Sequence, residues 1–312
     1  LGFVACLCCI IPFSRNAIIA LMQMALGRTL RDVQQWDSVI IHSMLFFATL
    51  IAYWYFLWYT RRGTAIYGVL RERTKQVFLH TNTKKYLFLL FIVYFVSYWA
   101  LLRANYEYAD DIRRVYSGHK AWVGTSRYVS ETLAVFLHTN FFINDISPIG
   151  QLCALAILTV SSYMLAYCIT DGKLSWSTVL ASSIVGVSPY YFFNFAYKYD
   201  TPYMALSVLF GILPFLFAKE ERAFIAASFV SLLLVCTSYQ ASNSIYIILA
   251  LFWIFRMWLQ KESWKRIGRF AAVAVVCYVL TLFFFKLLLM MPDESTDIHD
   301  GGEMAFNASI FS

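Results

Sequence analysis

The chain has 312 residues, of which 60% are hydrophobic and only 14% are charged. An ordinary soluble domain is excluded, because such domains contain about 45–50% apolar and about 25% charged residues and could not bury this much apolar surface. The formal net charge of +7 lies mostly in short segments between apolar runs, so it favours a role in membrane topology and argues against a nucleic-acid partner.

The apolar runs predict an all-α, polytopic integral membrane helical bundle, since each approaches the ~20 residues that a helix needs to cross a bilayer. Residues 2–26 are interrupted by Pro12 and Arg15, and we interpret them as one poor span or a surface helix. Clear spans are expected at residues 38–59, 86–102, 148–170, 174–193, 203–218, 223–239, 244–259 and 270–291. Pro189, Pro202 and Pro214 are expected to bend or end helices.

The polar segments between these spans predict their orientation. Residues 60–85 carry seven basic residues against Glu72 alone, so the positive-inside rule places this loop in the cytoplasm. Alternation then places residues 103–147, 195–202 and 240–243 outside, and the second basic loop, residues 261–269, inside.

The cysteines and the known short motifs indicate no cofactor and no metal. All seven cysteines lie inside apolar runs, where a thiol packs as a small hydrophobic group, so neither a disulfide framework nor a zinc site is expected. The sequence contains no Gly-rich P-loop, no Gly-x-Ser-x-Gly elbow and no HExxH pair.

Two adjacent carboxylates, Asp110 and Asp111, follow the 86–102 span closely enough to meet a lipid headgroup. Mutual repulsion and partial burial would raise at least one pKa, which suits a general base. Basic residues follow at Arg113, Arg114, His119, Lys120 and Arg127. This mixture favours recognition of a phosphorylated lipid. The alternatives are simple ion pairs with Arg113 and Arg114, or an ordinary solvated loop.

Residues 128–142 have apolar side chains at helical spacing, which predicts an amphipathic helix. Such a helix would either lie flat in the membrane interface and wall a lipid-entry groove, or form a short re-entrant element. His138 on this segment is expected to be a packing or capping residue.

Lys198 and Asp200 form a second polar group, at the external end of the 174–193 span and between tyrosines. Tyr197 and Tyr199 are candidates for stacking on a sugar ring, and the alternative is an interfacial aromatic belt. Gln240, in the external turn at residues 240–243, is a candidate for binding sugar hydroxyls, although any turn needs polar residues. Lys286 interrupts an apolar run and either binds a lipid phosphate or snorkels to the interface.

Four stretches carry a resemblance to a known family. YADDIRRVYSGHKAW (residues 108–122), SRYVSETL (126–133), FAYKYDTPYMALS (195–207) and SYQAS (238–242) resemble the glucosyl transferase II family. This family comprises the serotype-converting O-antigen glucosyltransferases of bacteria and their temperate phages. The resemblance covers roughly residues 86–291.

The resemblance implies a GT-C-like enzyme of the bacterial inner membrane whose active site faces the periplasm. Its donor would be a polyprenyl-phosphate sugar, usually undecaprenyl-phosphate glucose, and its acceptor the O-antigen repeat of lipopolysaccharide. The acidic motif of the family falls on Asp110 and Asp111, and its second acidic position on Asp200. We expect residues 1–85 to form one or more N-terminal spans and a basic cytoplasmic loop. Residues 86–312 are expected to form a GT-C-like membrane glycosyltransferase domain without its C-terminal part.

The mechanism expected from these residues is direct displacement at the anomeric carbon with inversion. One of Asp110 and Asp111 takes the acceptor proton, and the other orients the sugar or holds an arginine. Arg113, Arg114, Lys198 and Lys286 stabilise the leaving phosphate. The competing hypotheses are a flippase for a lipid-linked sugar and a GT-C enzyme that modifies a teichoic acid or a protein.

Overall fold

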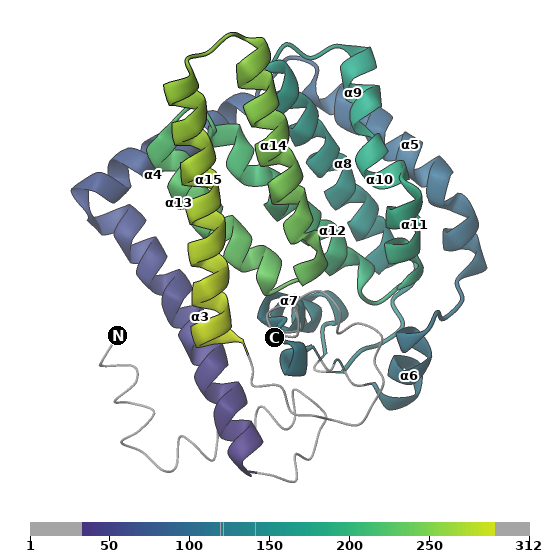
Figure 1. Ribbon diagram of the computed structural model, residues 1–312. Coiled ribbons are helices and arrows are strands. Elements are labelled where there is room, and N and C mark those ends of the chain that lie inside the picture. The colour runs from purple at the N-terminus through teal and green to yellow at the C-terminus, as the bar shows by residue number, and fades with distance from the viewer. Residues whose placement is uncertain (1–32, 119, 121, 141, 291–312) are drawn as a thin grey trace, which may run out of the picture.

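The computed structural model describes residues 33–118, 120, 122–140 and 142–290, and these residues form helices and no strand. The expected element at residues 2–26 lies outside the described residues. The helices are α3 Val33–Tyr59, α4 Arg61–Phe78, α5 Thr83–Ala104, α6 Asp110–Ser117, α7 Tyr128–His138, α8 Ile149–Thr170, α9 Trp176–Ser182, α10 Ile184–Val187, α11 Pro189–Ala196, α12 Thr201–Ile212, α13 Glu221–Cys236, α14 Asn243–Leu259 and α15 Trp264–Phe284 (Figure 1). Short 3₁₀ and π segments are η1 Val123–Thr125, η2 Leu213–Phe217, η3 Gln240–Ser242 and η4 Phe285–Leu289.

The expected membrane-crossing character is confirmed. Among the described residues, five helices are long and apolar enough to cross a bilayer: Ile40–Tyr59, Thr83–Ala104, Ile149–Thr170, Gln240–Leu259 and Trp264–Leu289. A sixth crossing results if α9 to α11 are taken as one span bent by 53°. The prolines act as expected, since Pro189 starts α11 at this bend and Pro202 lies in the first turn of α12.

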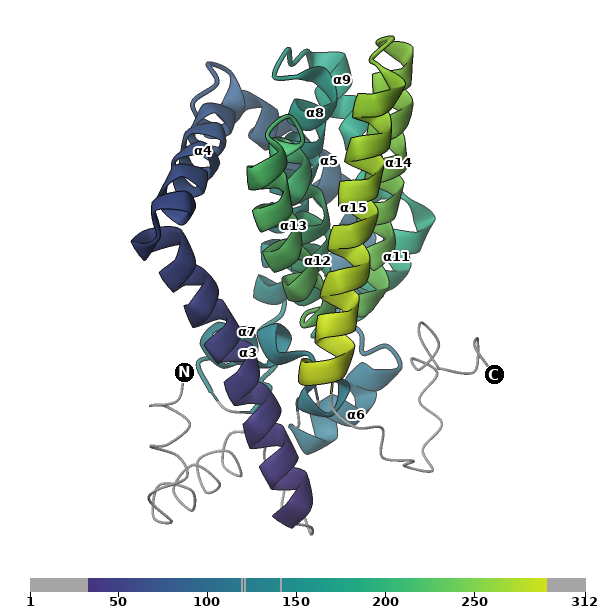
Figure 2. The same cartoon turned by 60° about the vertical axis from the view of Figure 1, so that its left-hand side comes forward.

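Two of the expected spans are shorter than a bilayer crossing requires. α12 continues at Leu213 into the tighter η2, which contains Pro214, and α13 has 16 residues. An α-helix of this length extends about 24 Å, less than the ~30 Å of a hydrocarbon core. α12 packs against α8 and α14, and α13 packs against α12, α14 and α15 (Figures 1 and 2). Their lengths are therefore set by packing against protein.

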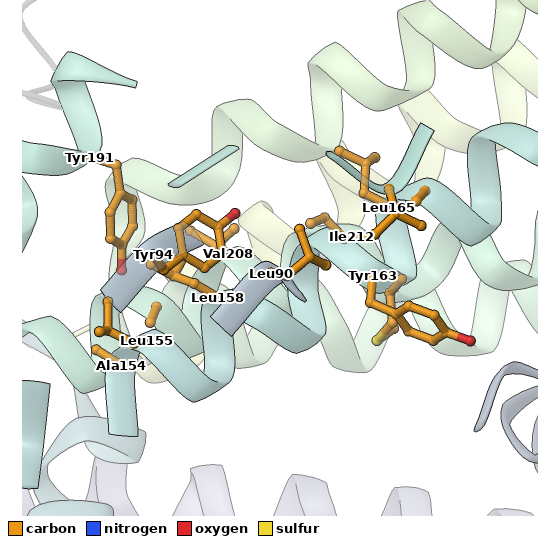
Figure 3. Close-up of a cluster of buried hydrophobic side chains, with 14 of the residues drawn as sticks. Leu90, Tyr94, Ala154, Leu155, Leu158, Tyr163, Leu165, Tyr191, Val208 and Ile212 are labelled. Atoms are coloured by element: carbon orange, nitrogen blue, oxygen red, sulfur yellow. The ribbon is translucent and has the colours of Figure 1, made fainter. Parts of the chain in front are cut away.

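The main core joins α5, α8 and α12. Leu90 and Tyr94 of α5 meet Leu155 and Leu158 of α8 and Val208 of α12 (Figure 3). This close packing extends to α10, because the Gly186 carbonyl accepts a hydrogen bond from the hydroxyl of Tyr98. A Cβ at Gly186 would lie 2.6 Å from the Tyr94 ring, so only glycine allows this approach.

The loops separate into two groups at opposite ends of the bundle, as alternation predicted. The connections after α8, η2 and α14 lie at the upper end in Figure 1, and α6 and α7 lie at the lower end. The predicted amphipathic helix is present as α7, which buries Val129 and Ala134 and leaves Phe136 exposed. α3 reaches this lower end through Phe46, whose ring stacks on Tyr128 at 5.5 Å.

Candidate active site

Backbone geometry fixes α6 at both of its ends. Asn105 (φ 42°) closes α5 and Ala109 (φ 49°) precedes α6, so the chain turns sharply between the two helices. Gly118 ends α6 in the left-handed conformation (φ 66°), which only glycine adopts without strain, and its carbonyl accepts the amide hydrogen of Ile143 at 3.0 Å. The Gly after the Asp-Asp-Ile-x-Arg run is therefore the helix C-cap that turns the chain toward Trp122.

The two adjacent aspartates occupy different environments. Asp111 is fully buried, its Oδ2 accepts the backbone N–H of Lys198 at 2.8 Å, and burial raises the pKa of its carboxyl. Asp110 is the first residue of α6, is exposed, and interacts electrostatically with Arg114, Arg127 and Tyr197. Only Asp110 is accessible to a ligand without a rearrangement of α6.

Replacing Asp111 tests its structural contribution. Asn retains an acceptor oxygen for the Lys198 N–H and avoids burying a charge, whereas Ala leaves this buried donor unpaired. We expect Asp111→Ala to lower the free energy of unfolding by about 1–3 kcal/mol, and Asp111→Asn to lower it less. Thermal unfolding of both purified variants in one detergent measures the difference. Equal destabilisation by Asn and Ala would rule out this hydrogen bond as the reason.

Asp200 is the centre of the site. Its Oδ1 accepts the indole N–H of Trp122 at 2.6 Å and lies 3.5 Å from Nη1 of Arg127, while its Oδ2 accepts a hydrogen bond from Arg114. These partners come from α6, from the loop before η1 and from the N-terminal boundary of α7. No role for Trp122 was predicted from the sequence. Its position four residues after Gly118, at the end of the motif that begins with Asp110 and Asp111, could have indicated one.

The two arginines beside Asp200 also contact aromatic rings. Arg114 lies 5.0 Å above the Trp122 ring, and Arg127 lies 5.2 Å above Tyr239. Burial lowers the pKa of both guanidinium groups, but arginine remains protonated in proteins. The side chain of Arg127 is 24% exposed, so its remaining N–H groups can reach a ligand.

Lys198 binds protein carboxylates. Its side chain is 1% exposed, and its Nζ lies 2.9 Å from Oδ2 of Asp145, 3.1 Å from Oε1 of Glu107 and 3.5 Å from Oδ1 of Asn105. Burial alone would lower the pKa of Lys198, but the hydrogen bonds to Asp145 and Glu107 outweigh it and raise that pKa. Asp145 and Glu107 are partners of Lys198 that the sequence did not reveal, because only their external location was evident from it.

This ion-pair group predicts an acid-sensitive contribution to stability. The hydrogen bond from Lys198 lowers the pKa of Glu107. Burial raises the pKa of Asp145, but the hydrogen bonds from Lys198 and Ser147 and the charge of Lys198 together outweigh it, so that this pKa is also lowered. The stabilisation by these ion pairs is present above the unfolded-state pKa values, 4.5 for Glu107 and 3.8 for Asp145. It is lost as the pH falls through the lower pKa values of the folded state. We expect the melting temperature of Lys198→Met to decline less than that of the unchanged protein below about pH 4.5. Parallel declines would contradict the assignment.

The two tyrosines predicted to stack on a sugar ring differ in their exposure. Tyr197 is half-buried against Tyr108 and Phe193, at ring distances of 5.2 and 5.6 Å, whereas Tyr199 is buried beneath Lys198. Of the two, only Tyr197 is therefore partly exposed to a ligand.

Gln240 of η3 donates to the carbonyl of Thr125 at 3.4 Å, beside the arginines. Lys286 lies on η4 with its side chain exposed, and within the described part of the chain no contact joins it to Asp200. Arg113 belongs to α6, and its side chain lies outside what the structure describes. His138 binds the Asn144 carbonyl at 2.9 Å, as expected for a capping residue.

Comparison with known proteins places these residues in a family context. A family model described as "Glucosyl transferase GtrII" matches residues 99–311, a range that includes every site residue discussed above. The chain is also 23% identical over 217 residues to an uncharacterized 55.3 kDa protein in the gtrB 5′ region of Salmonella phage P22. The aligned region covers 68% of this chain and 44% of the phage protein, so the chain spans less than half of that relative's length. No solved structure matches the chain.

Proposed function

The chain belongs to the glucosyl transferase GtrII family, and from this premise we propose that it is a membrane glycosyltransferase acting on the O-antigen. It takes a glucosyl group from a polyprenyl-phosphate carrier, undecaprenyl phosphate, and attaches it to the O-antigen repeat unit on the periplasmic face of the inner membrane. The observation that carries this proposal is an exposed carboxylate, Asp110, in the field of Arg114 and Arg127 at one end of an apolar bundle.

Asp110 is the proposed general base. A base must come within hydrogen-bonding distance of the acceptor hydroxyl, and Asp111 is fully buried with one oxygen bound to the Lys198 N–H. Asp110 accepts the proton as the hydroxyl oxygen attacks the anomeric carbon. The bond from that carbon to the phosphate oxygen breaks, and the anomeric configuration is inverted.

Arg127 and Arg114 are the proposed phosphate ligands. The lipid phosphate gains one negative charge when the sugar leaves, and two guanidinium groups already fixed beside Asp200 can stabilise this charge without reorganising. Lys198 is assigned a positioning role, because Asp145 and Glu107 already occupy its ammonium group. Tyr197 and Gln240 are the proposed sugar contacts.

The distribution of charge favours an enzyme over a flippase. In the described part of the chain the buried charged residues are Asp111, Lys120, Lys198 and Asp200. All of them belong to segments at the α6 and α7 end of the bundle, and Lys120 pairs with Glu131 of α7 at 3.0 Å. A flippase would require acidic and basic residues along a path between the two ends.

The proposal is tested with the purified protein in detergent, where no compartments exist for a flippase to connect. Labelled glucose on undecaprenyl phosphate is mixed with O-antigen, and we expect label to appear in the polysaccharide. A nucleotide-linked glucose of the same label serves as the matched control and should give no transfer. Transfer from the nucleotide sugar alone, or movement of label only across intact vesicles, would overturn the proposal.

A further inference from the structure

A second charged cavity lies at the other end of the bundle. It has a volume of about 320 Å³ and is formed where α8 and α14 end and where α13 and α15 begin. Its lining contains four cations against three carboxylates, and the cations are Lys219, Arg256, Arg266 and Arg269. None of these residues belongs to the candidate active site around Asp200.

The inner part of the cavity is held by protein contacts. Arg256 donates to the Cys168 carbonyl at 3.0 Å and to the Asp171 carboxylate, and its guanidinium lies 5.0 Å from the centre of the Trp253 ring. Lys219 contacts the other oxygen of Asp171 at 2.9 Å. Arg256 is 16% exposed, and both of its terminal nitrogens already donate hydrogen bonds to protein oxygens. It therefore stabilises the cavity, and the donors available to a ligand come from other residues.

The rim of the cavity has unused donors. Nη1 of Arg266 contacts Glu262 at 2.9 Å, and Nε of Arg269 contacts Glu221 at 2.6 Å, but both arginines are more than half exposed. Exposed ion pairs contribute little stability, about 0–1 kcal/mol, so an anion can replace their partners easily. Within the described part of the chain, Nε and Nη2 of Arg266 and Nη1 of Arg269 have no protein partner.

One wall of the cavity is apolar and continues toward the membrane-crossing parts of α14 and α15. Phe224 and Phe270 face each other at 5.2 Å, and both line the cavity together with Trp253. Exposed tryptophans flank it, Trp258 near the end of α14 and Trp264 at the start of α15. Exposed tryptophans are typical of the headgroup level of a bilayer.

From this geometry we propose that the cavity binds the phosphate group of an anionic phospholipid, with Arg266 and Arg269 as its ligands and the aromatic wall in contact with the acyl region. The site is separate from glucosyl transfer. Free phosphate shares the recognised chemistry, but the aromatic wall and the flanking tryptophans favour a lipid as the source. The loops at this end were expected in the cytoplasm, which would place the lipid in the opposite leaflet from the proposed active site.

The test measures binding of phosphatidylglycerol to the purified protein in detergent, with phosphatidylcholine and inorganic phosphate as comparison probes. We expect the double variant Arg266→Gln/Arg269→Gln to bind phosphatidylglycerol about tenfold more weakly, equivalent to about 1.4 kcal/mol. The matched control Arg71→Gln/Lys75→Gln removes two exposed charges from α4 and should leave the affinity unchanged. Phosphatidylcholine should bind more weakly to the unchanged protein.

Three outcomes would overturn the inference. One is an unchanged phosphatidylglycerol affinity in Arg266→Gln/Arg269→Gln. Another is an equal loss in the α4 control, which would indicate general surface charge. The third is an affinity for inorganic phosphate equal to or higher than that for phosphatidylglycerol, which would indicate a site for free phosphate. If the glutamine pair fails to fold, Arg266→Lys/Arg269→Lys keeps both charges and loses the guanidinium geometry, and should bind with intermediate affinity.

Discussion

Replacing Asp110 with asparagine is expected to reduce glucosyl transfer by about 10²–10⁴-fold, the contribution typical of a general base. The amide cannot accept the acceptor's proton, but it has nearly the same size, and Asp110 is exposed at the start of α6. Folding and membrane insertion should therefore be retained. The measurement is the rate of label transfer from undecaprenyl-phosphate glucose to O-antigen.

Asp111→Asn is the matched control for this experiment, because it makes the same chemical change one residue later. Its carboxyl is buried against the Lys198 N–H, so the loss of transfer should be much smaller than in Asp110→Asn. If Asp110→Asn transfers glucose normally while Asp111→Asn is inactive, the base is Asp111 and α6 must move during the reaction. Normal transfer by both variants would exclude the pair from proton transfer.

Replacing Asp200 with alanine is expected to lower the free energy of unfolding by about 3–5 kcal/mol, the usual effect of removing one partner from a buried ion pair. Asp200 is 4% exposed, accepts hydrogen bonds from Arg114 and the Trp122 indole, and lies 3.5 Å from Nη1 of Arg127. Its loss leaves two partly buried cations and one buried N–H without their acceptor. Thermal and denaturant unfolding of the purified protein in one detergent measure the change.

The double variant Asp200→Ala/Arg114→Met separates charge from general disruption. Removing Arg114 as well takes away one of the stranded cations, so the double variant should be less destabilised than the sum of the two single variants. Strict additivity would mean that Asp200 and Arg114 do not act as a pair. Asp200→Asn should be intermediate in stability, since its carbonyl still accepts the Trp122 N–H.

The membrane architecture followed largely from the sequence. The long apolar runs gave α3, α5, α8, α14 and α15. The bend at Pro189 and the end of the regular α12 helix next to Pro214 agree with the prediction that these prolines bend or end helices. These features depend on local properties, namely the length of an apolar run and the missing N–H of proline. The lengths of α12 and α13 were predicted less well, because neighbouring helices cover them.

The sequence also determined the family, since the Asp-Asp-Ile-x-Arg run with its glycine and tryptophan, and the Lys-Tyr-Asp run, lie within the residues that the GtrII family matches. Only the tertiary structure separated Asp110 from Asp111, paired Lys198 with Glu107 and Asp145, and joined Trp122 to Asp200. The physical reason is distance along the chain. Burial and hydrogen bonding between residues that are tens of positions apart depend on how α6, α7 and the α11–α12 connection pack together, and no local pattern encodes that packing.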